Sequence, residues 1–315
     1  MYQFRVGNLG KELESKIDWI APVALGIALV GIASASILIA IAETEIQPNA
    51  ITCDRLLIAA ATFGIWNSLS AANNSNLDET PADSPYTSRA IALLLTAGIS
   101  FAISLALWAW SLTQTSIANS TLLNNMMPIF TTLGGWAFFR QRFSKRFLVG
   151  MAIAISGALA VGIEDLQAAE SHLTGDGAAL TAAIFSAISI LSLEQLRVSF
   201  ATSTIMQWTS LAGALFLLPL VLLAGESLLP LSKAGWLAVI GLGLISQAIG
   251  QGLLTFSLAK FSSGFVAVSM LAIPIIAAIL ARFIFAERLS TLNYFAFAIV
   301  LGGIYLVVSA TTPED

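Results

Sequence analysis

The most informative feature of the sequence is an internal repeat. Its first copy is residues 109–161, AWSLTQTSIANSTLLNNMMPIFTTLGGWAFFRQRFSKRFLVGMAIAISGALAV. It aligns without gaps on residues 255–307, TFSLAKFSSGFVAVSMLAIPIIAAILARFIFAERLSTLNYFAFAIVLGGIYLV. The matches include a proline within an apolar run, an Arg-x-Ser in the next connection and a later glycine: Pro128 with Pro274, Arg142 with Arg288, Ser144 with Ser290, and Gly157 with Gly303. This register indicates two copies of one structural unit.

The composition places both copies in a membrane. Hydrophobic residues make up 57% of the chain and charged residues 10%, whereas soluble domains carry roughly 25% charged residues. Many apolar runs reach the length of about 20 residues that a helix needs to cross the hydrocarbon core. They are continuous, whereas strands of a membrane barrel alternate with a period of two. We therefore expect an all-α integral membrane protein.

Ten apolar segments are expected to span the membrane, and they lie near residues 19–42, 54–71, 89–112, 116–139, 146–163, 177–197, 203–224, 234–258, 263–285 and 291–310. They form two halves of five helices, 19–163 and 177–310, joined by an external loop at 164–176. An odd number of spans inverts the second half, so the repeats are expected to be inverted, as in many secondary transporters.

The polar segments complete the predicted organisation. The loop 72–88, ANNSNLDETPADSPYTS, is polar and holds two prolines, so we expect it to be mobile. Residues 1–18 and 311–315 are predicted to be cytoplasmic, because cytoplasmic loops carry an excess of Lys and Arg. That side would hold ten basic residues: Arg5, Lys11, Lys16, Arg89, Arg140, Arg142, Lys145, Arg146, Arg197 and Lys260. The outer side would hold Arg55, Lys233, Arg282 and Arg288.

Several motifs resemble the EamA-type repeat of the drug/metabolite transporter superfamily. The first copy has Pro128-Ile129-Phe130, Arg142-Phe143-Ser144 and Gly157; the second has Pro274, Ala286-Glu287-Arg288-Leu289-Ser290 and Gly303, after an entry Gly175-Asp176-Gly177-Ala178-Ala179-Leu180. The resemblance implies ten helices around a central cavity, a plasma (inner) membrane location and export or exchange of small metabolites. One departure is Gln141, which stands where the second copy has Glu287.

Polar residues within the apolar segments are candidates for the substrate path. Ser116, Ser120, Asn124 and Pro128 recur every four residues, and a polar stripe in lipid has to face the protein interior. It lines the path or hydrogen-bonds to a neighbouring helix, with Asn124 the strongest candidate. Pro128 and Pro274 act as hinges or as static kinks, since proline removes a helical hydrogen bond.

Two glutamines, Gln247 and Gln251, share another helix face. Amides both donate and accept hydrogen bonds, which suits a zwitterionic or neutral polar substrate; the alternative is contact between helices. Weaker candidates are Asn67, Trp108 and Gln207.

The charged residues do not support ion coupling or catalysis. No acidic or basic residue is expected near a helix midpoint, and Glu194 is expected to pair with Arg197 three residues later. His172 is the only histidine, and hydrolase and metal-ligand motifs are missing from the sequence. We expect no enzyme, cofactor or metal site.

The sequence thus predicts a secondary transporter of small polar organic metabolites, such as amino acids, that works by alternating access. A membrane binding or scaffold protein and a channel remain alternatives. The expected partners are a small-molecule substrate and the lipid bilayer. Nucleic acid is not expected, because no basic block occurs. The sequence does not distinguish between a monomer and a homodimer.

Overall fold

The computed structural model describes residues 19–74, 86–161, 173–285 and 290–311, and the regular structure within these ranges is entirely helical. In chain order the elements are α2 (Ile20–Ala33), α3 (Ala35–Ala42), α4 (Pro48–Asn74), α5 (Ser88–Gln114), α6 (Ile117–Asn124), α7 (Met127–Phe139), α8 (Lys145–Val161), α10 (Leu173–Leu196), α11 (Thr202–Leu223), α12 (Lys233–Gly241), the π-helix η1 (Leu242–Gln251), α13 (Gly252–Ser257), α14 (Ser263–Ser269), the 3-10 turn η2 (Met270–Ala272), α15 (Ile273–Phe285) and α16 (Thr291–Thr311).

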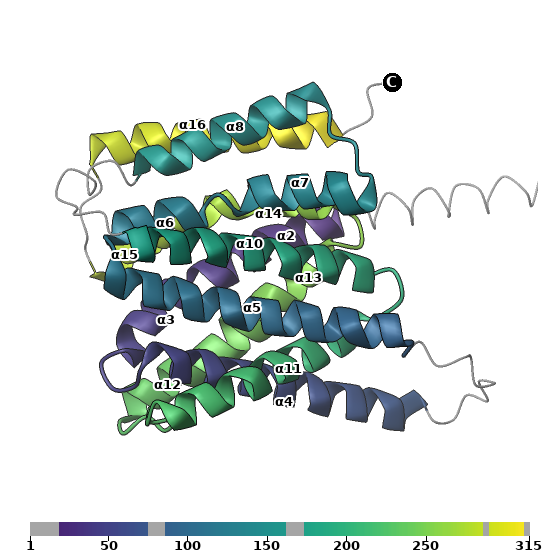
Figure 1. Cartoon of the computed structure of the whole chain (residues 1–315), viewed down its shortest axis with the longest axis vertical. Helices are drawn as coiled ribbons and strands as arrows, with labels where there is room; N and C mark the ends of the chain where they lie inside the picture. The colour runs from purple at the N-terminus through teal and green to yellow at the C-terminus, as the bar shows by residue number, and fades with distance from the viewer. Residues whose placement is uncertain (1–18, 75–85, 162–172, 286–289, 312–315) are drawn as a thin grey trace, which may run out of the picture.

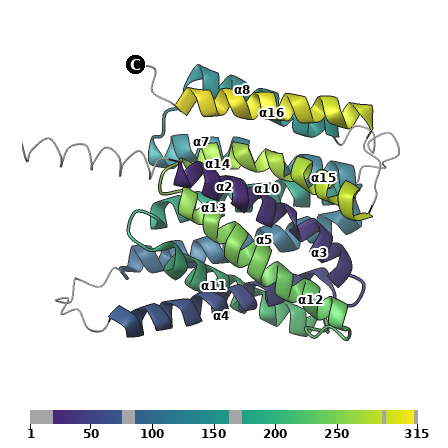
Figure 2. The same cartoon turned by 180° about the vertical axis from the view of Figure 1, so that it is seen from behind.

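The helices lie side by side and are stacked along the long axis of the molecule (Figures 1 and 2). The pair α8 and α16 lies at one end of the stack, and α4 and α12 lie at the other. The α7–α8 and α10–α11 connections share one side of the bundle, so Arg140, Arg142 and Arg197 lie on the same side.

Seven helices within the described residues are long and apolar enough to cross a membrane: Ile20–Ala42, Ser88–Gln114, Leu173–Leu196, Thr202–Leu223, Lys233–Ser257, Ser263–Ile284 and Thr291–Ala310. The other three expected spans correspond to α4, α6 with α7, and α8. Asp54 and Arg55 lower the apolarity of α4, a turn separates α6 from α7, and the described part of α8 has 17 residues. Length and apolarity alone therefore support a multi-pass protein with seven such helices, not the ten expected.

The predicted connections lie partly outside the described residues, which exclude 1–18, 75–85, 162–172, 286–289 and 312–315. Within the described residues two boundaries differ from the expectation. Residues 72–74 of the predicted 72–88 loop continue α4, and α10 begins at Leu173, four residues before the expected start.

Both helices that contain the matched prolines are interrupted just before the proline. α6 ends at Asn124 and α7 begins at Met127, while η2 separates α14 from α15. Pro128 and Pro274 are each the second residue of the new helix. Proline is tolerated there because the first-turn N–H groups have no partner within the helix. The expected bend within a continuous helix is therefore an interruption between two shorter helices in each case.

Glycines bring α8 and α16 into backbone contact. A Cβ atom added to Gly157 would lie 2.7 Å from the amide nitrogen of Val300 and 3.0 Å from the carbonyl oxygen of Ala296. One added to Gly303 would lie 2.6 Å from the carbonyl oxygen of Gly150 and closer still to the amide nitrogen of Ala154. The two helices run antiparallel, since higher residue numbers on α8 meet lower numbers on α16.

Candidate substrate site

A small cavity lies between helices from both halves of the chain and is lined by Leu56, Ala97, Gly98, Phe101, Ser189, Leu193, Met206, Thr209, Ser210, Gln251 and Thr255. These residues come from α4, α5, α10, α11 and the η1–α13 helix. The cavity volume is about 20 Å³, which is room for about one water molecule and far below the roughly 300 Å³ of small-molecule pockets. The helices around it have to move apart before a small compound can enter.

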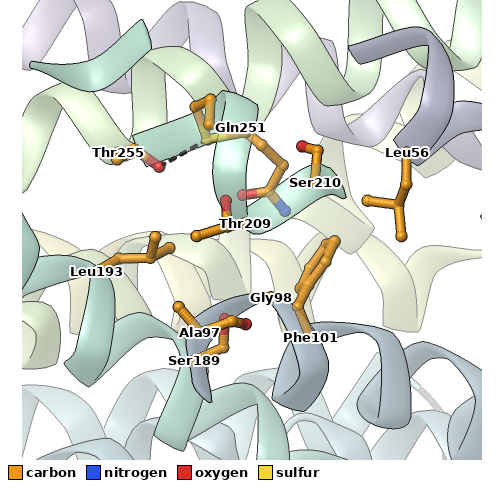
Figure 3. Close-up of a pocket in the computed structure, with 11 residues that line it drawn as sticks. Leu56, Ala97, Gly98, Phe101, Ser189, Leu193, Thr209, Ser210, Gln251 and Thr255 are labelled. Carbon is orange, nitrogen blue, oxygen red and sulfur yellow. Dashed lines mark hydrogen bonds between the residues drawn. The ribbon is translucent and has the colours of Figure 1, made fainter. Parts of the chain in front are cut away.

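Two polar side chains of this cavity have no hydrogen-bond partner among the described residues. Ser210 Oγ is buried and unpaired, and the Gln251 amide makes no hydrogen bond there. Figure 3 shows the Gln251 amide directed into the space beside Thr209 and Ser210. The hydroxyls of Ser189 and Thr209 instead donate to the carbonyl oxygens of Ala97 and Ile205. Ser210 and Gln251 are therefore the groups free to bind a ligand. Gln251 is one of the substrate-path candidates predicted from the sequence.

Next to the cavity, a buried arginine contacts the second predicted glutamine. Arg55 Nε and Nη2 donate to Gln247 Oε1 over 3.2 and 2.9 Å, and both side chains are almost fully buried. The guanidinium carbon lies 5.7 Å from the centroid of the Phe101 ring, which is within the range of a cation–π contact. Gln247 thus binds a cation, a role that the sequence did not predict for it.

The start of α4 differs from the sequence analysis, which placed Arg55 at the beginning of a helix near residue 54. Helix α4 begins at Pro48 instead, because proline fits the first turn of a helix. Arg55 therefore lies about 10 Å along the helix, at a rise of 1.5 Å per residue. A charged residue is buried in the bundle after all.

Asn67 and Gln207, two weaker candidates from different halves, contact each other directly. Asn67 Nδ2 donates to Gln207 Oε1 over 2.7 Å across the α4–α11 interface. Neither residue lines the cavity. Their geometry fits contact between helices at least as well as a place on the substrate path.

The remaining candidates lie on the α5–α6 hairpin, outside the residues that line the cavity. Ser120 is fully buried and shares a short hydrogen bond with Ser111. Asn124 Oδ1 and Trp108 Nε1 are buried and have no hydrogen-bond partner in the part of the chain that the structure describes. Unpaired buried polar atoms are uncommon, so Asn124 and Trp108 remain candidates, whereas the Ser120 hydroxyl already has Ser111 as a partner.

Glu194 makes contacts other than the expected pair with Arg197. Its carboxylate accepts hydrogen bonds from Gln141 Nε2 at 3.0 and 2.9 Å, and from the amide nitrogen and hydroxyl of Ser263 at 3.2 and 2.7 Å. Arg197 Nη1 donates to the carbonyl oxygen of Phe200 instead. Donors from the α7–α8 connection and from the start of α14 therefore replace the local i,i+3 partner. Gln141, where the second copy has a glutamate, is able to donate to this carboxylate.

These features define a multi-pass α-helical membrane protein with a polar site between the two halves of its chain. The sequence pattern of the EamA-like transporter family matches residues 13–163 and 173–309. The chain belongs to this family.

Two known proteins are distantly related to this chain. The chain is 24% identical over 207 residues to the uncharacterized transporter YetK of Bacillus subtilis, covering 64% of this chain and 62% of YetK. It is 23% identical over 198 residues to a probable terminal-alkyne amino-acid exporter of Streptantibioticus cattleyicolor, covering 63% of this chain and 66% of that exporter. The alignments thus span less than two thirds of either relative.

The fold also matches a protein of known crystal structure. The TM-score is 0.75, with 93% of this chain and 99% of the other covered and 17% sequence identity. At this identity the likeness establishes the fold alone.

Proposed function

We propose that this protein is a secondary transporter that exports or exchanges small polar organic metabolites, such as amino acids, by alternating access. The observation that carries the proposal is the cavity between the two halves, in which Ser210 and Gln251 have no hydrogen-bond partner among the described residues. Buried polar groups such as the Ser210 hydroxyl are normally paired, and in this proposal a polar ligand supplies the missing partner once the cavity has widened. Membership of a transporter family and the relative named as an amino-acid exporter support the same substrate class.

The transporter is proposed to span the membrane ten times as two inverted halves, 19–163 and 177–310. The contacts between α8 and α16 support this arrangement. The repeat matches Gly157 with Gly303, Ala154 with Val300 and Gly150 with Ala296. Gly157 contacts Val300 and Ala296, and Gly303 contacts Ala154 and Gly150, so exchanging the halves reproduces the interface.

Two further observations support the inverted halves. α5 packs along α10, and α2 packs along η1 and α13; exchanging the halves turns one of these pairs into the other. The interruptions before Pro128 and Pro274 also match. The basic residues of the α7–α8 connection favour cytoplasmic termini in the plasma (inner) membrane.

Alternating access requires that the ends of the bundle open in turn, and both ends hold specific side-chain contacts. At the end that carries Arg197, Glu194 links Gln141 and Ser263. At the opposite end, Glu226 accepts hydrogen bonds from Asn49 Nδ2 at 2.8 Å and from the Ala50 amide at 3.0 Å, which connects α4 to the α11–α12 connection. We propose that these two sets of contacts alternate, while Pro128 and Pro274 allow the shorter helices to pivot.

The proposal is tested by comparing metabolites in the medium of cells that overexpress the protein with those of cells that carry an empty vector. The wild type should enrich at least one small polar compound outside the cell. Gln251→Leu, which removes the unpaired amide, should abolish most of that enrichment at equal amounts of protein in the membrane.

Gln47→Leu is the matched control, because Gln47 is exposed and outside the cavity. It should export as the wild type does. No enrichment across a broad panel, with the protein present in the membrane, would contradict metabolite export.

A further inference from the structure

The Arg55 side chain is a buried cation without an anion. It is 6% exposed, and its guanidinium donates only to the neutral amide oxygen of Gln247. Among the described residues no carboxylate forms an ion pair with it. An amide oxygen accepts hydrogen bonds but carries no net charge, so the positive charge of Arg55 is not neutralised.

Asp54 is the nearest acidic residue in sequence, and it does not compensate this charge. Successive residues of a helix point about 100° apart, and Asp54 Oδ2 is itself buried without a hydrogen-bond partner in the described part of the chain. An unpaired charge in a protein interior is strongly unfavourable, and charged residues inside membrane helices commonly mark substrate paths. Arg55 is therefore available to bind an anion from outside the protein.

Arg55 does not itself line the cavity, but residues that it contacts lie beside the cavity or in its wall. Phe101, whose ring lies under the guanidinium, lines the cavity. Gln247 lies about one turn from Gln251 in η1, and Gln251 also lines it. The guanidinium has five N–H donors, and the two on Nη1 have no acceptor among the described residues.

We propose that Arg55 binds a carboxylate group of the transported molecule. This inference rests on the proposed transport function and adds its substrate class: a small compound with one carboxylate, whose polar remainder contacts Ser210 and Gln251. A guanidinium donates two parallel hydrogen bonds to a carboxylate. A single arginine suits one monoanion, and the neighbouring cavity of about 20 Å³ has to widen to admit it.

A purely structural role is the alternative, in which Arg55 only links α4 to η1 through Gln247. The two roles differ in selectivity. A binding role makes the protein distinguish a carboxylate from the carboxamide of the same compound, because the amide lacks the charge but keeps the shape. A structural role gives equal recognition of both.

The test uses the purified full-length protein. Neutral L-amino acids and short monocarboxylates are each paired with their own carboxamide, and inorganic phosphate is included as a different anion. Binding is measured by the shift of the melting temperature with concentration, and flux is measured with the same compounds in proteoliposomes. We expect at least one carboxylate to bind about 10- to 100-fold more tightly than its carboxamide, as for one hydrogen bond to a charged group.

Variants assign this preference to Arg55. Arg55→Gln should remove it, Arg55→Lys should keep part of it because the charge remains, and Arg89→Gln should keep it fully because Arg89 is exposed and away from the cavity. If Arg55→Gln does not fold, the inference is still tested by Arg55→Lys and by the comparison of carboxylate with carboxamide binding in the wild type, which needs no variant.

Equal binding of carboxylates and carboxamides by the wild type, preferred binding of phosphate, or an unchanged preference in Arg55→Gln would each overturn the inference. Flux without a carboxylate preference would leave the transport function standing and refute the role of Arg55. Arg55-dependent binding of a carboxylate without flux of any compound would support the role of Arg55 and contradict the transport function.

Discussion

Substituting either of the two matched glycines of the α8–α16 interface should destabilise the protein by a similar amount. In Gly157→Ala, the new Cβ would lie 2.7 Å from the Val300 amide nitrogen and 2.8 Å from its Cγ2 atom. In Gly303→Ala, it would lie 2.6 Å from the Gly150 carbonyl oxygen and 2.7 Å from the Ala154 Cα atom. Favourable separations between carbon atoms are about 3.5–4.0 Å, so the helices have to move apart by roughly 1 Å.

The expected magnitude follows from this overlap. The nearest atoms are largely backbone, which cannot move away by changing a rotamer, and overpacking of this kind costs about 1–3 kcal/mol. The matched control is Gly302→Ala on the same helix, because a Cβ there meets nothing within 4 Å. It should not destabilise the protein and should gain up to about 1 kcal/mol from helix propensity, a gain that Gly157→Ala and Gly303→Ala share and that offsets part of their cost.

The assay is the free energy of unfolding of each purified variant in mixed micelles, titrated with a denaturing detergent. Gly157→Ala and Gly303→Ala should both shift the transition toward less detergent. If either variant unfolds like Gly302→Ala, the helices are not in backbone contact at that position. If only one is destabilised, the symmetric interface between the halves is wrong.

Two further predictions concern the ends of the bundle. Glu194→Ala should destabilise the protein by about 1–3 kcal/mol, because the donors of Gln141 and Ser263 lose their acceptor. Glu194→Gln should cost less, and thermal melting at neutral pH compares the two; equal melting of Glu194→Ala and wild type would contradict the contacts. Hydrogen bonds from Ser232 and Leu231 lower the pKa of Glu45 below its usual value of 4.5. An acid with a lowered pKa stabilises the fold when ionised, above about pH 4.5, and loses this contribution as the pH falls through the folded-state pKa. Glu45→Gln should therefore melt below wild type at pH 7, and the difference should disappear in acid. Glu43→Gln should have the opposite sign, because burial raises the pKa of Glu43; a pH-independent difference for Glu45→Gln would refute the assignment.

The apolar runs predicted where helices form because hydrophobic length and continuity are properties of local sequence. The beginning of α4 was predicted less well. The polar residues Pro48, Asn49 and Asp54 interrupt the hydrophobic pattern, so the helix was expected to begin near 54. Burial of Arg55 depended on that boundary and on α5 and η1 covering it, and neither is visible in local sequence.

Partners across the bundle could not be read from spacing within one helix. The i,i+3 spacing favoured Glu194 with Arg197, but Gln141 and Ser263 are brought to the carboxylate by helices far apart in sequence. The same holds for Asn67 with Gln207. Gln251 was predictable because it shares an interior polar face with Gln247, whereas Ser210 lacked any comparable local signal.

The most direct test of the account is counterflow in proteoliposomes that contain the purified protein and an internal load of the compound found in the medium. A carrier that alternates between two sides should take up a trace of labelled compound faster when the unlabelled compound is inside, with a rate that saturates with concentration. Gln251→Leu should lose this stimulation, and Gln47→Leu should keep it. Uptake that increases linearly with concentration and does not respond to the internal load would contradict alternating access and favour a channel.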